Sequence, residues 1–406
     1  MPDTVYLYIG TWKTGTTYLQ NVLWNNRRTL AADGVLVPGK EALREQAYAV
    51  MDVLGVAGSA ARPKKTAGAW DRLVRMISAW SGSTAVVSTE RLSIAQPRQV
   101  RRIVADLAPA EVRVVLTARD LGRTIPASWQ ERLKNWNAWS WPEFITSVTQ
   151  PPPWTNQPAK GFWAQQDVVG ILSRWGEAVP TERITVVTVP PPGAPRDVLV
   201  NRFAESIGMD VATWDTAVDR LNESLGAAEA ELLRRVNPGI RARVSWPAYE
   251  RHVKLGLARD VLAARPDQRR FALPPEHFDW VLERSEQVVA DLQRKGYPVI
   301  GDLADLLPVR PAADVPAPDE VTDTEVLAAA DDVIVALVER LAERDKEGRT
   351  SARRGTRQPS RSDQAASRPF ARLRTLGRSV AGRRDAAGSV SVRSAVRAVR
   401  AERGRH

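Results

Sequence analysis

Lysine, threonine and glycine residues suited to holding an anion cluster between residues 13 and 17. Lys13-Thr14-Gly15-Thr16-Thr17 follows a short β-branched and aromatic run, residues 4–9, and precedes a helix-like segment, residues 18–24. A strand, a small-residue loop and a helix aim backbone N–H groups and the positive helix end at a phosphate-like anion. Lys13 adds a mobile charge, and the three threonines add hydroxyl donors. The pattern predicts an anion-binding loop; an ordinary βα turn rich in Gly and Thr is the other interpretation.

The order of residues in this loop differs from that of nucleotide-hydrolysing P-loops. A Walker A loop ends in Gly-Lys-[Ser/Thr], which places the lysine at the start of the helix beside a hydroxyl that binds Mg²⁺. Here Lys13 comes two residues before Gly15. This order argues against a nucleotide kinase or NTPase, which remains an alternative function.

A second candidate anion site begins at Arg119, directly after an apolar run at residues 112–118. Arginine supplies a planar charged fork that suits phosphate, and Ser128 in the following helical segment supplies a hydroxyl. Arg123 and Thr124 are alternatives to Ser128. The pattern predicts a second phosphate subsite.

The elements that must position these residues alternate between strands and helices. Strand patterns at residues 4–9, 84–89, 112–118 and 184–189 are separated by helical periodicity. This alternation predicts an α/β fold, with a mainly parallel sheet flanked by helices in a three-layer sandwich like that of P-loop NTPases. Ligands of such sheets bind beyond the carboxyl ends of the strands. The polar residues that follow three of these strands should therefore lie along one edge.

The two anion sites together resemble those of PAPS-dependent sulfotransferases, which use 3′-phosphoadenosine 5′-phosphosulfate (PAPS). The resemblance is to the bacterial type and covers residues 4–300. It implies transfer of a sulfuryl group from PAPS to a hydroxyl of a small-molecule, carbohydrate or lipid acceptor, with no metal. The spacing from arginine to serine is one residue longer here than is usual in the family. The residues that the resemblance assigns to the 5′-phosphosulfate are Lys13, Thr14, Gly15, Thr16 and Thr17, and those it assigns to the 3′-phosphate are Arg119 and Ser128.

The resemblance also calls for a catalytic base. Members of the family use a histidine or a glutamate, and no histidine precedes His252. Glu90, at the end of the strand pattern at residues 84–89, is the best-placed carboxylate. It would take the proton from the acceptor hydroxyl as that oxygen attacks sulfur, with Lys13 stabilising the leaving group. Glu41 and Glu131 are alternatives, and a plain surface glutamate is the non-catalytic interpretation.

The chain divides into five expected segments. Six of its 14 tryptophans lie between residues 129 and 163, where they could pack a helical insertion or stack on the rings of an acceptor. Four prolines between residues 308 and 318 favour a linker. The segments are an α/β domain (1–305), its Trp-rich helical insertion, a possible lid or acceptor cleft (129–165), the linker (306–321), an amphipathic helix (322–345) and an Arg-rich tail (346–406).

Composition narrows the classes of function. The chain has no cysteine and three scattered histidines, so no metal site is expected. It shows no secretory leader or apolar span, which predicts a cytoplasmic protein. The net charge of +11 arises in the tail, whose 17 Lys and Arg against four Asp and Glu give +13, so that residues 1–345 carry −2.

The tail is too poor in apolar residues to form a core, and it is expected to be disordered. It could bind a membrane surface or an acidic partner, and a non-catalytic scaffold that works through it is a further alternative. Nucleic-acid binding by the nearly neutral folded domain is not expected.

Overall fold

Six parallel strands form a single sheet in the order β2-β3-β1-β4-β5-β6 in this computed structural model, which describes residues 1–40, 44–56, 63–217, 224–312 and 315–355. The expected α/β fold, a parallel sheet flanked by helices, is confirmed. The strands are β1 (Thr4–Tyr8), β2 (Val35–Leu36), β3 (Thr84–Ser88), β4 (Glu111–Ala118), β5 (Ile184–Thr188) and β6 (Val299–Ile300).

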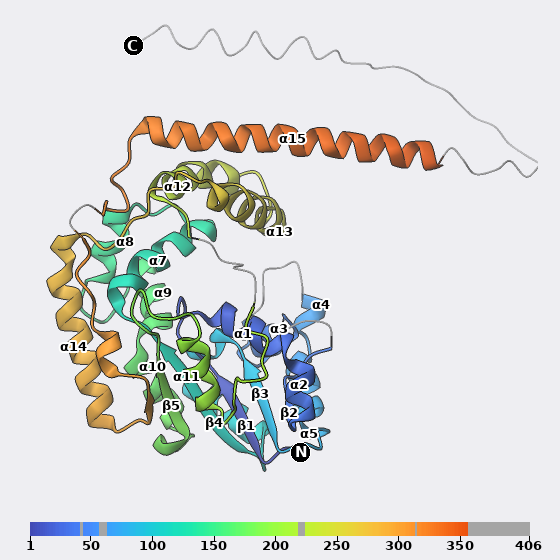
Figure 1. Ribbon diagram of the computed structural model, residues 1–406, viewed down its shortest axis with the longest axis vertical. Helices are drawn as coiled ribbons and strands as arrows, with labels where there is room; N and C mark the ends of the chain where they lie inside the picture. Colours follow the sequence, from blue (N-terminus) through green and yellow to red (C-terminus); the bar gives the residue numbers. More distant parts are fainter. Residues whose placement is uncertain (41–43, 57–62, 218–223, 313–314, 356–406) are drawn as a thin grey trace, which may run out of the picture. The chain divides into compact units, whose positions relative to one another are not determined.

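Helices cover both faces of the sheet and extend beyond its carboxyl edge (Figure 1). The α-helices are α1 (Thr16–Asn25), α2 (Arg27–Ala32), α3 (Arg44–Val53), α4 (Pro63–Thr66), α5 (Ala69–Ser78), α6 (Pro97–Asp106), α7 (Leu121–Lys134), α8 (Trp141–Val148), α9 (Gln157–Gln166), α10 (Val168–Gly176), α11 (Val198–Ser206), α12 (Ala227–Arg241), α13 (Trp246–Tyr249), α14 (Phe278–Lys295) and α15 (Asp323–Gly355). Short 3-10 helices are η1 (Glu90–Ile94), η2 (Thr181–Arg183), η4 (Leu262–Ala264), η5 (Pro275–His277) and η6 (Leu303–Leu306), and η3 (Glu250–Arg259) is a π-helix.

The strand order brings the predicted anion-binding segments together. β1 pairs with β3 on one side and β4 on the other, and Tyr8 lies opposite Ser88 and Val115. The order reverses at β1, because β3 and β2 extend one way and β4, β5 and β6 the other. Such a reversal leaves a crevice at the carboxyl edge, where ligands of α/β sheets bind. The loops after β1 and β4 flank this crevice.

Three apolar clusters hold the layers. One packs α3, α5, α6, α10 and α14 on one face of the sheet, and a second packs α1, α2 and α11 on the other. The third joins α7, α8, α9, α12 and η3, and Figure 1 shows these helices gathered beyond the carboxyl ends of the strands. Trp129, Trp141 and Trp163 of the Trp-rich segment are buried in this third cluster. The segment's other three tryptophans, Trp136, Trp139 and Trp154, are partly buried and pack against the same cluster.

Two details differ from the sequence expectations. Residues 299–300 form β6 on β5, whereas the sequence pattern predicted helices that end near residues 296–298 and no strand after them. Helix with a break near Gly208 was expected over residues 196–221; α11 ends at Ser206 and Gly208 takes a left-handed φ of 69°, but residues 209–217 after this break form no helix. Within the stretch expected as a linker, Pro316 is buried and its carbonyl accepts from the Ala272 N–H at 3.3 Å.

Contacts divide the chain into two units, residues 1–346 and 347–406. Residues 323–345 of the segment expected as an amphipathic helix (322–345) lie within the longer α15. Of the expected disordered tail, residues 356–406 lie outside the described part of the chain. Among the helices that the structure describes, none combines the length and apolar character that a membrane crossing requires.

Candidate active site

The loop between β1 and α1 has a tightly curved backbone. Gly15 precedes α1 with φ of 83°, and Lys13 has φ of 68°. The left-handed region is uncommon for a residue with a side chain and costs on the order of 1–3 kcal/mol. Arg119, which follows β4, donates from Nη1 to the Lys13 carbonyl oxygen at 3.1 Å and so holds this conformation. The loop and Arg119 are therefore one structural unit.

A chain of buried hydroxyls anchors the loop to β4. Thr14 Oγ1 donates to the Thr11 carbonyl at 2.6 Å, so the 2.6 Å contact with Thr117 Oγ1 must be donated by Thr117. Tyr8 then donates its phenol proton to Thr117 at 3.0 Å, and burial raises the pKa of this phenol, which keeps it a neutral donor. The Thr14 hydroxyl is thus committed to the protein, and only its backbone N–H remains for an anion.

Thr14→Val should lower the free energy of unfolding by about 2–3 kcal/mol, because it removes two buried hydrogen bonds and strands their partners. Urea titration of the variant measures this. Thr146→Val, at an exposed position on α8, is the matched control and should change stability by less than about 0.5 kcal/mol. Equal effects at the two positions would show that the hydroxyl chain does not anchor the loop.

Thr16 and Thr17 form the first turn of α1. Thr16 is buried and Thr17 is half-buried. The first N–H groups of a helix have no partner within it, and they carry the positive end of its dipole. The backbone N–H groups of these two residues therefore lie at the end of the loop that contains Lys13.

Three lysines surround one carboxylate on α7. Glu131 pairs with Lys13 at 3.2 Å and with Lys254 of η3 at 3.0 Å, and Lys134 lies on the next turn of α7. Burial alone would raise the pKa of Glu131, but the charges of Lys13, Lys254 and Lys134 lower it to about 2. Burial in turn lowers the pKa of Lys134 to about 8. We call these four residues the lysine cluster; its three ammonium groups and one carboxylate leave an excess of positive charge.

Glu131 therefore anchors Lys13 and makes a poor catalytic base. Its depressed pKa means that the charged form stabilises the fold above the ordinary value of 4.5 and that this stability is lost as pH falls towards about 2. We expect Glu131→Gln to cost about 3 kcal/mol at pH 7. The difference from the wild type should shrink as pH falls below 4.5.

Chemical denaturation at several pH values measures this difference. Glu177→Gln is the matched control, since its ion pair with Arg101 is exposed and should contribute little at any pH. A Glu131→Gln defect that stays constant down to pH 2 would contradict the ionic origin of its effect.

Glu90 opens η1 directly beyond β3. It is half-buried and accepts a hydrogen bond from Gln20 Nε2 of α1 at 2.9 Å. The Thr89 N–H donates to the Tyr8 carbonyl at 3.1 Å, which ties the β3 end to the β1 end. Within the described part of the chain Glu90 forms no ion pair, and the Gln20 amide is the one side-chain hydrogen-bond partner of its carboxylate. Glu41, one of the alternatives, lies outside the described residues.

Arg119 also lines a cavity of about 380 Å³. We call it the arginine cavity, after Arg119, Arg123, Arg270 and Arg310 in its wall; none of the described residues that line it is acidic. The Arg119 Nε is buried without a partner among the described residues. Burial, together with the charge of Arg123, lowers the pKa of Arg119 to about 10, so the guanidinium is still charged at neutral pH. The cavity can accept a second anion.

Ser128 lies apart from this cavity. It is buried on α7 and is not among the described residues of the cavity wall, which uses the opposite side of the helix around Arg123 and Ala127. Arg119 and Ser128 are thus not brought to one pocket, and a phosphate role for Ser128 stays a prediction. Arg123 does line the cavity, held by Asp120 and by the Pro190 carbonyl at 3.1 Å.

Sequence reasoning missed four cationic members of the site. Lys254, Arg270 and Arg310 come from distant segments, and only folding reveals their position. Lys134 carried a usable signal, because it lies three residues after Glu131 on the same helix, a spacing that brings side chains together. Among the described residues, no three His, Asp or Glu side chains gather as a metal would require.

Comparison with known proteins adds little. No protein-family model and no curated protein matches the chain. Solved structures do match, among them a sulfotransferase from Alicyclobacillus acidocaldarius. It is 15% identical with a TM-score of 0.36, and the match covers 54% of this chain and 86% of that one. A likeness this distant assigns no activity, so the function of this chain has to be argued from its own residues.

Proposed function

We propose that this protein is a PAPS-dependent sulfotransferase. The observation that carries the proposal is the position of Arg119, which bonds the Lys13 carbonyl at 3.1 Å and also lines the arginine cavity. PAPS has two anionic ends, a 5′-phosphosulfate and a 3′-phosphate, joined by a nucleoside. A cationic loop and a cationic cavity that share one arginine suit such a ligand. A cavity of 380 Å³ is also of the size that small-molecule sites have.

The residues divide the work of transfer as follows. The N–H groups of the loop and of α1 hold the phosphosulfate, and Lys13 neutralises the bridging oxygen as 3′,5′-bisphosphoadenosine leaves. Glu90 takes the proton of the acceptor hydroxyl while its oxygen forms the new bond to sulfur and the old sulfur–oxygen bond breaks. Glu131 and Lys254 orient Lys13. The protein's contribution is alignment and charge stabilisation, which this reaction mainly demands.

A ring-containing hydroxyl compound, such as a sugar, is the acceptor class that the site favours. Trp136 and Trp246 are stacked with centroids 5.5 Å apart and line an open cavity of about 320 Å³. Asn135 lines the same cavity and accepts from Lys254 Nζ of the lysine cluster at 2.7 Å. Indole faces that border the cluster suit the apolar face of a ring.

Calorimetry with 3′,5′-bisphosphoadenosine tests the proposal. The full-length protein should bind this nucleotide without Mg²⁺ and should bind 5′-AMP more weakly, because 5′-AMP lacks the 3′-phosphate. Binding that requires ATP together with Mg²⁺ would instead favour a kinase or NTPase and would overturn the proposal.

Glu90→Gln should lower kcat by about 100-fold or more with little change in KM for PAPS, because the amide keeps a contact with Gln20 but accepts no proton. Steady-state kinetics separates the two constants. The matched control is Glu143→Gln, an exposed capping residue on α8. A Glu90→Gln enzyme with wild-type kcat would show that another group is the catalytic base.

A further inference from the structure

A groove on the side of the molecule formed by α3, α4 and α5 is larger than the arginine cavity. Its volume is about 860 Å³. Ala69, Leu73 and Met76 of α5 line it, and Tyr48 of α3 adds an aromatic ring. Ala69 and Leu73 also belong to the buried core that packs on the sheet. The floor of the groove is therefore rigid and mostly apolar.

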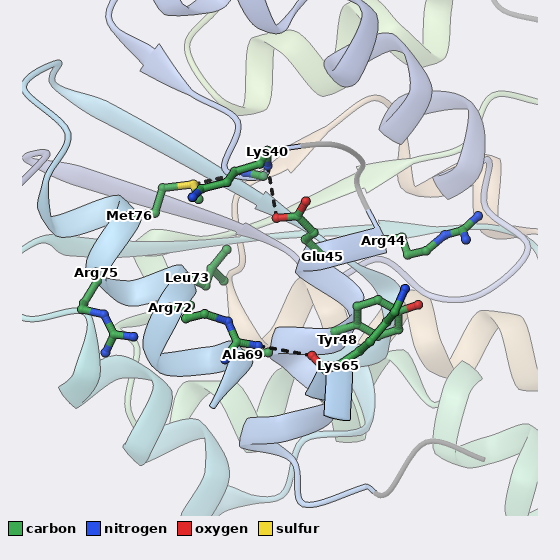
Figure 2. Close-up of a pocket in the computed structure, with 11 residues that line it drawn as sticks. Lys40, Arg44, Glu45, Tyr48, Lys65, Ala69, Arg72, Leu73, Arg75 and Met76 are labelled. Carbon is green, nitrogen blue, oxygen red and sulfur yellow. Dashed lines mark hydrogen bonds between the residues drawn. The ribbon is translucent and has the colours of Figure 1, made fainter. Parts of the chain in front are cut away.

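The wall of this groove is strongly cationic, and we therefore call it the basic groove. Figure 2 shows the charged side chains around it. They come from the segment after β2, from α3, from α4 and from α5, and they are Lys40, Arg44, Lys65, Arg72 and Arg75. Glu45 is the one acidic residue among the described residues of the wall, and it accepts from the Lys40 backbone N–H at 3.1 Å.

None of these five cations forms an ion pair within the described part of the chain. Arg72 donates to two backbone carbonyls, those of Ala67 at 2.9 Å and Lys65 at 3.3 Å, which fixes its guanidinium without cancelling its charge. Elsewhere in the folded unit arginines do find carboxylates, as Arg101 does with Glu177. Residues 1–345 carry a net charge of −2, so general basicity does not explain the cluster. Gathered like charges repel one another unless an anion joins them.

We propose that the basic groove binds a compact polyanion, a molecule with several phosphate or sulfate esters on a ring scaffold. Several separate cations call for several anionic groups. The volume suits one small molecule, and the apolar floor suits the face of a ring. The groove shares no described lining residue with the arginine cavity, so this site is separate from that of the nucleotide. It does not depend on the proposed sulfuryl transfer.

Calorimetry of the full-length protein with inositol hexakisphosphate tests this site. The double variant Arg44→Glu/Arg75→Glu changes two exposed residues that carry no described ion pair, so the fold should persist. Its affinity should fall by about 100-fold, since each lost charged contact is worth about tenfold. Arg98→Glu/Arg243→Glu changes two exposed arginines outside the groove and makes the same change in net charge. This control should lose less than about threefold in affinity.

The control also separates the groove from the basic tail, which is identical in both variants. Equal affinity in the two double variants would place the polyanion on the tail and overturn the proposal. The proposal would also be overturned if single-stranded DNA bound through the groove and inositol hexakisphosphate did not compete with it. Competition with vesicles that carry phosphatidylinositol bisphosphate tells whether the polyphosphate is free or lipid-borne. Binding of either ligand that is weakened in the groove variant, but not in the control variant, supports the site. Affinity for 3′,5′-bisphosphoadenosine should be unchanged in the groove variant, which keeps this test apart from that of the catalytic proposal.

Discussion

Lys13→Ala should reduce kcat for sulfuryl transfer from PAPS by about 100- to 1,000-fold, because it removes one preorganised donor from the leaving oxygen. The fold should persist, since Glu131 keeps its ion pair with Lys254 at 3.0 Å. Lys160→Ala, on the exposed side of α9, is the matched control and should leave kcat unchanged. Steady-state rates of bisphosphoadenosine release measure both variants. A Lys13→Ala protein that keeps more than about a third of wild-type kcat would remove Lys13 from the chemistry.

Lys13→Gly separates the role of the side chain from that of the backbone. The left-handed φ of 68° at this position suits glycine better than alanine. Both variants should lose activity to the same degree, while the glycine variant should unfold at the higher temperature of the two. Differential scanning calorimetry measures the unfolding temperatures of the two variants, and steady-state kinetics measures their activities. A glycine variant with restored activity would mean that backbone strain, and not the ammonium group, sets the rate.

Arg119→Lys should weaken binding of 3′,5′-bisphosphoadenosine by about 100-fold, because lysine cannot hold a phosphate and a carbonyl with one planar fork. Arg119 is the residue that the loop and the arginine cavity share. Arg310→Lys, at the exposed rim of the same cavity, is the matched control and should cost less than about threefold. Calorimetry with each protein measures both losses.

The comparison with 5′-AMP tells which end of the ligand Arg119 serves. If Arg119 holds the 3′-phosphate, the variant should lose most of its preference for bisphosphoadenosine over 5′-AMP. If the two nucleotides lose affinity equally, Arg119 acts only through the Lys13 loop, and the 3′-phosphate belongs to another arginine of the cavity. That result would contradict the two-ended arrangement on which the proposed function rests.

The strands could be predicted from sequence wherever their own residues specified them. β1, β3, β4 and β5 are runs of β-branched and aromatic residues, and each lies within a residue of its expected bounds. β6 was missed because its two residues, Val299 and Ile300, are a strand only through their pairing with β5. The break expected near Gly208 in the helical stretch at residues 196–221 coincides with the left-handed φ of that glycine, but residues 209–217, which were expected to be helical, form no helix.

The candidate site was predictable where its residues follow strands. Lys13, Glu90 and Arg119 lie in the segments that follow β1, β3 and β4, and parallel strands end at one edge. The partners of these residues were not predictable, because Lys254 joins Glu131 across 123 positions of the chain. The charges around a residue could not be predicted from sequence either. Glu131 was a candidate base by its sequence, but in the structure the surrounding lysines lower its pKa to about 2.

Transfer of radiolabelled sulfate from PAPS tests the central claim most directly. The full-length protein would be incubated with labelled PAPS and a panel of sugar, phenol and lipid hydroxyl acceptors, without added metal, beside Lys13→Ala. The account predicts label on at least one acceptor with the wild type, matched by stoichiometric release of 3′,5′-bisphosphoadenosine, and a loss of at least about 100-fold with the variant. Equal incorporation by the two proteins, or none by the wild type alongside Mg²⁺-dependent ATP hydrolysis, would contradict it.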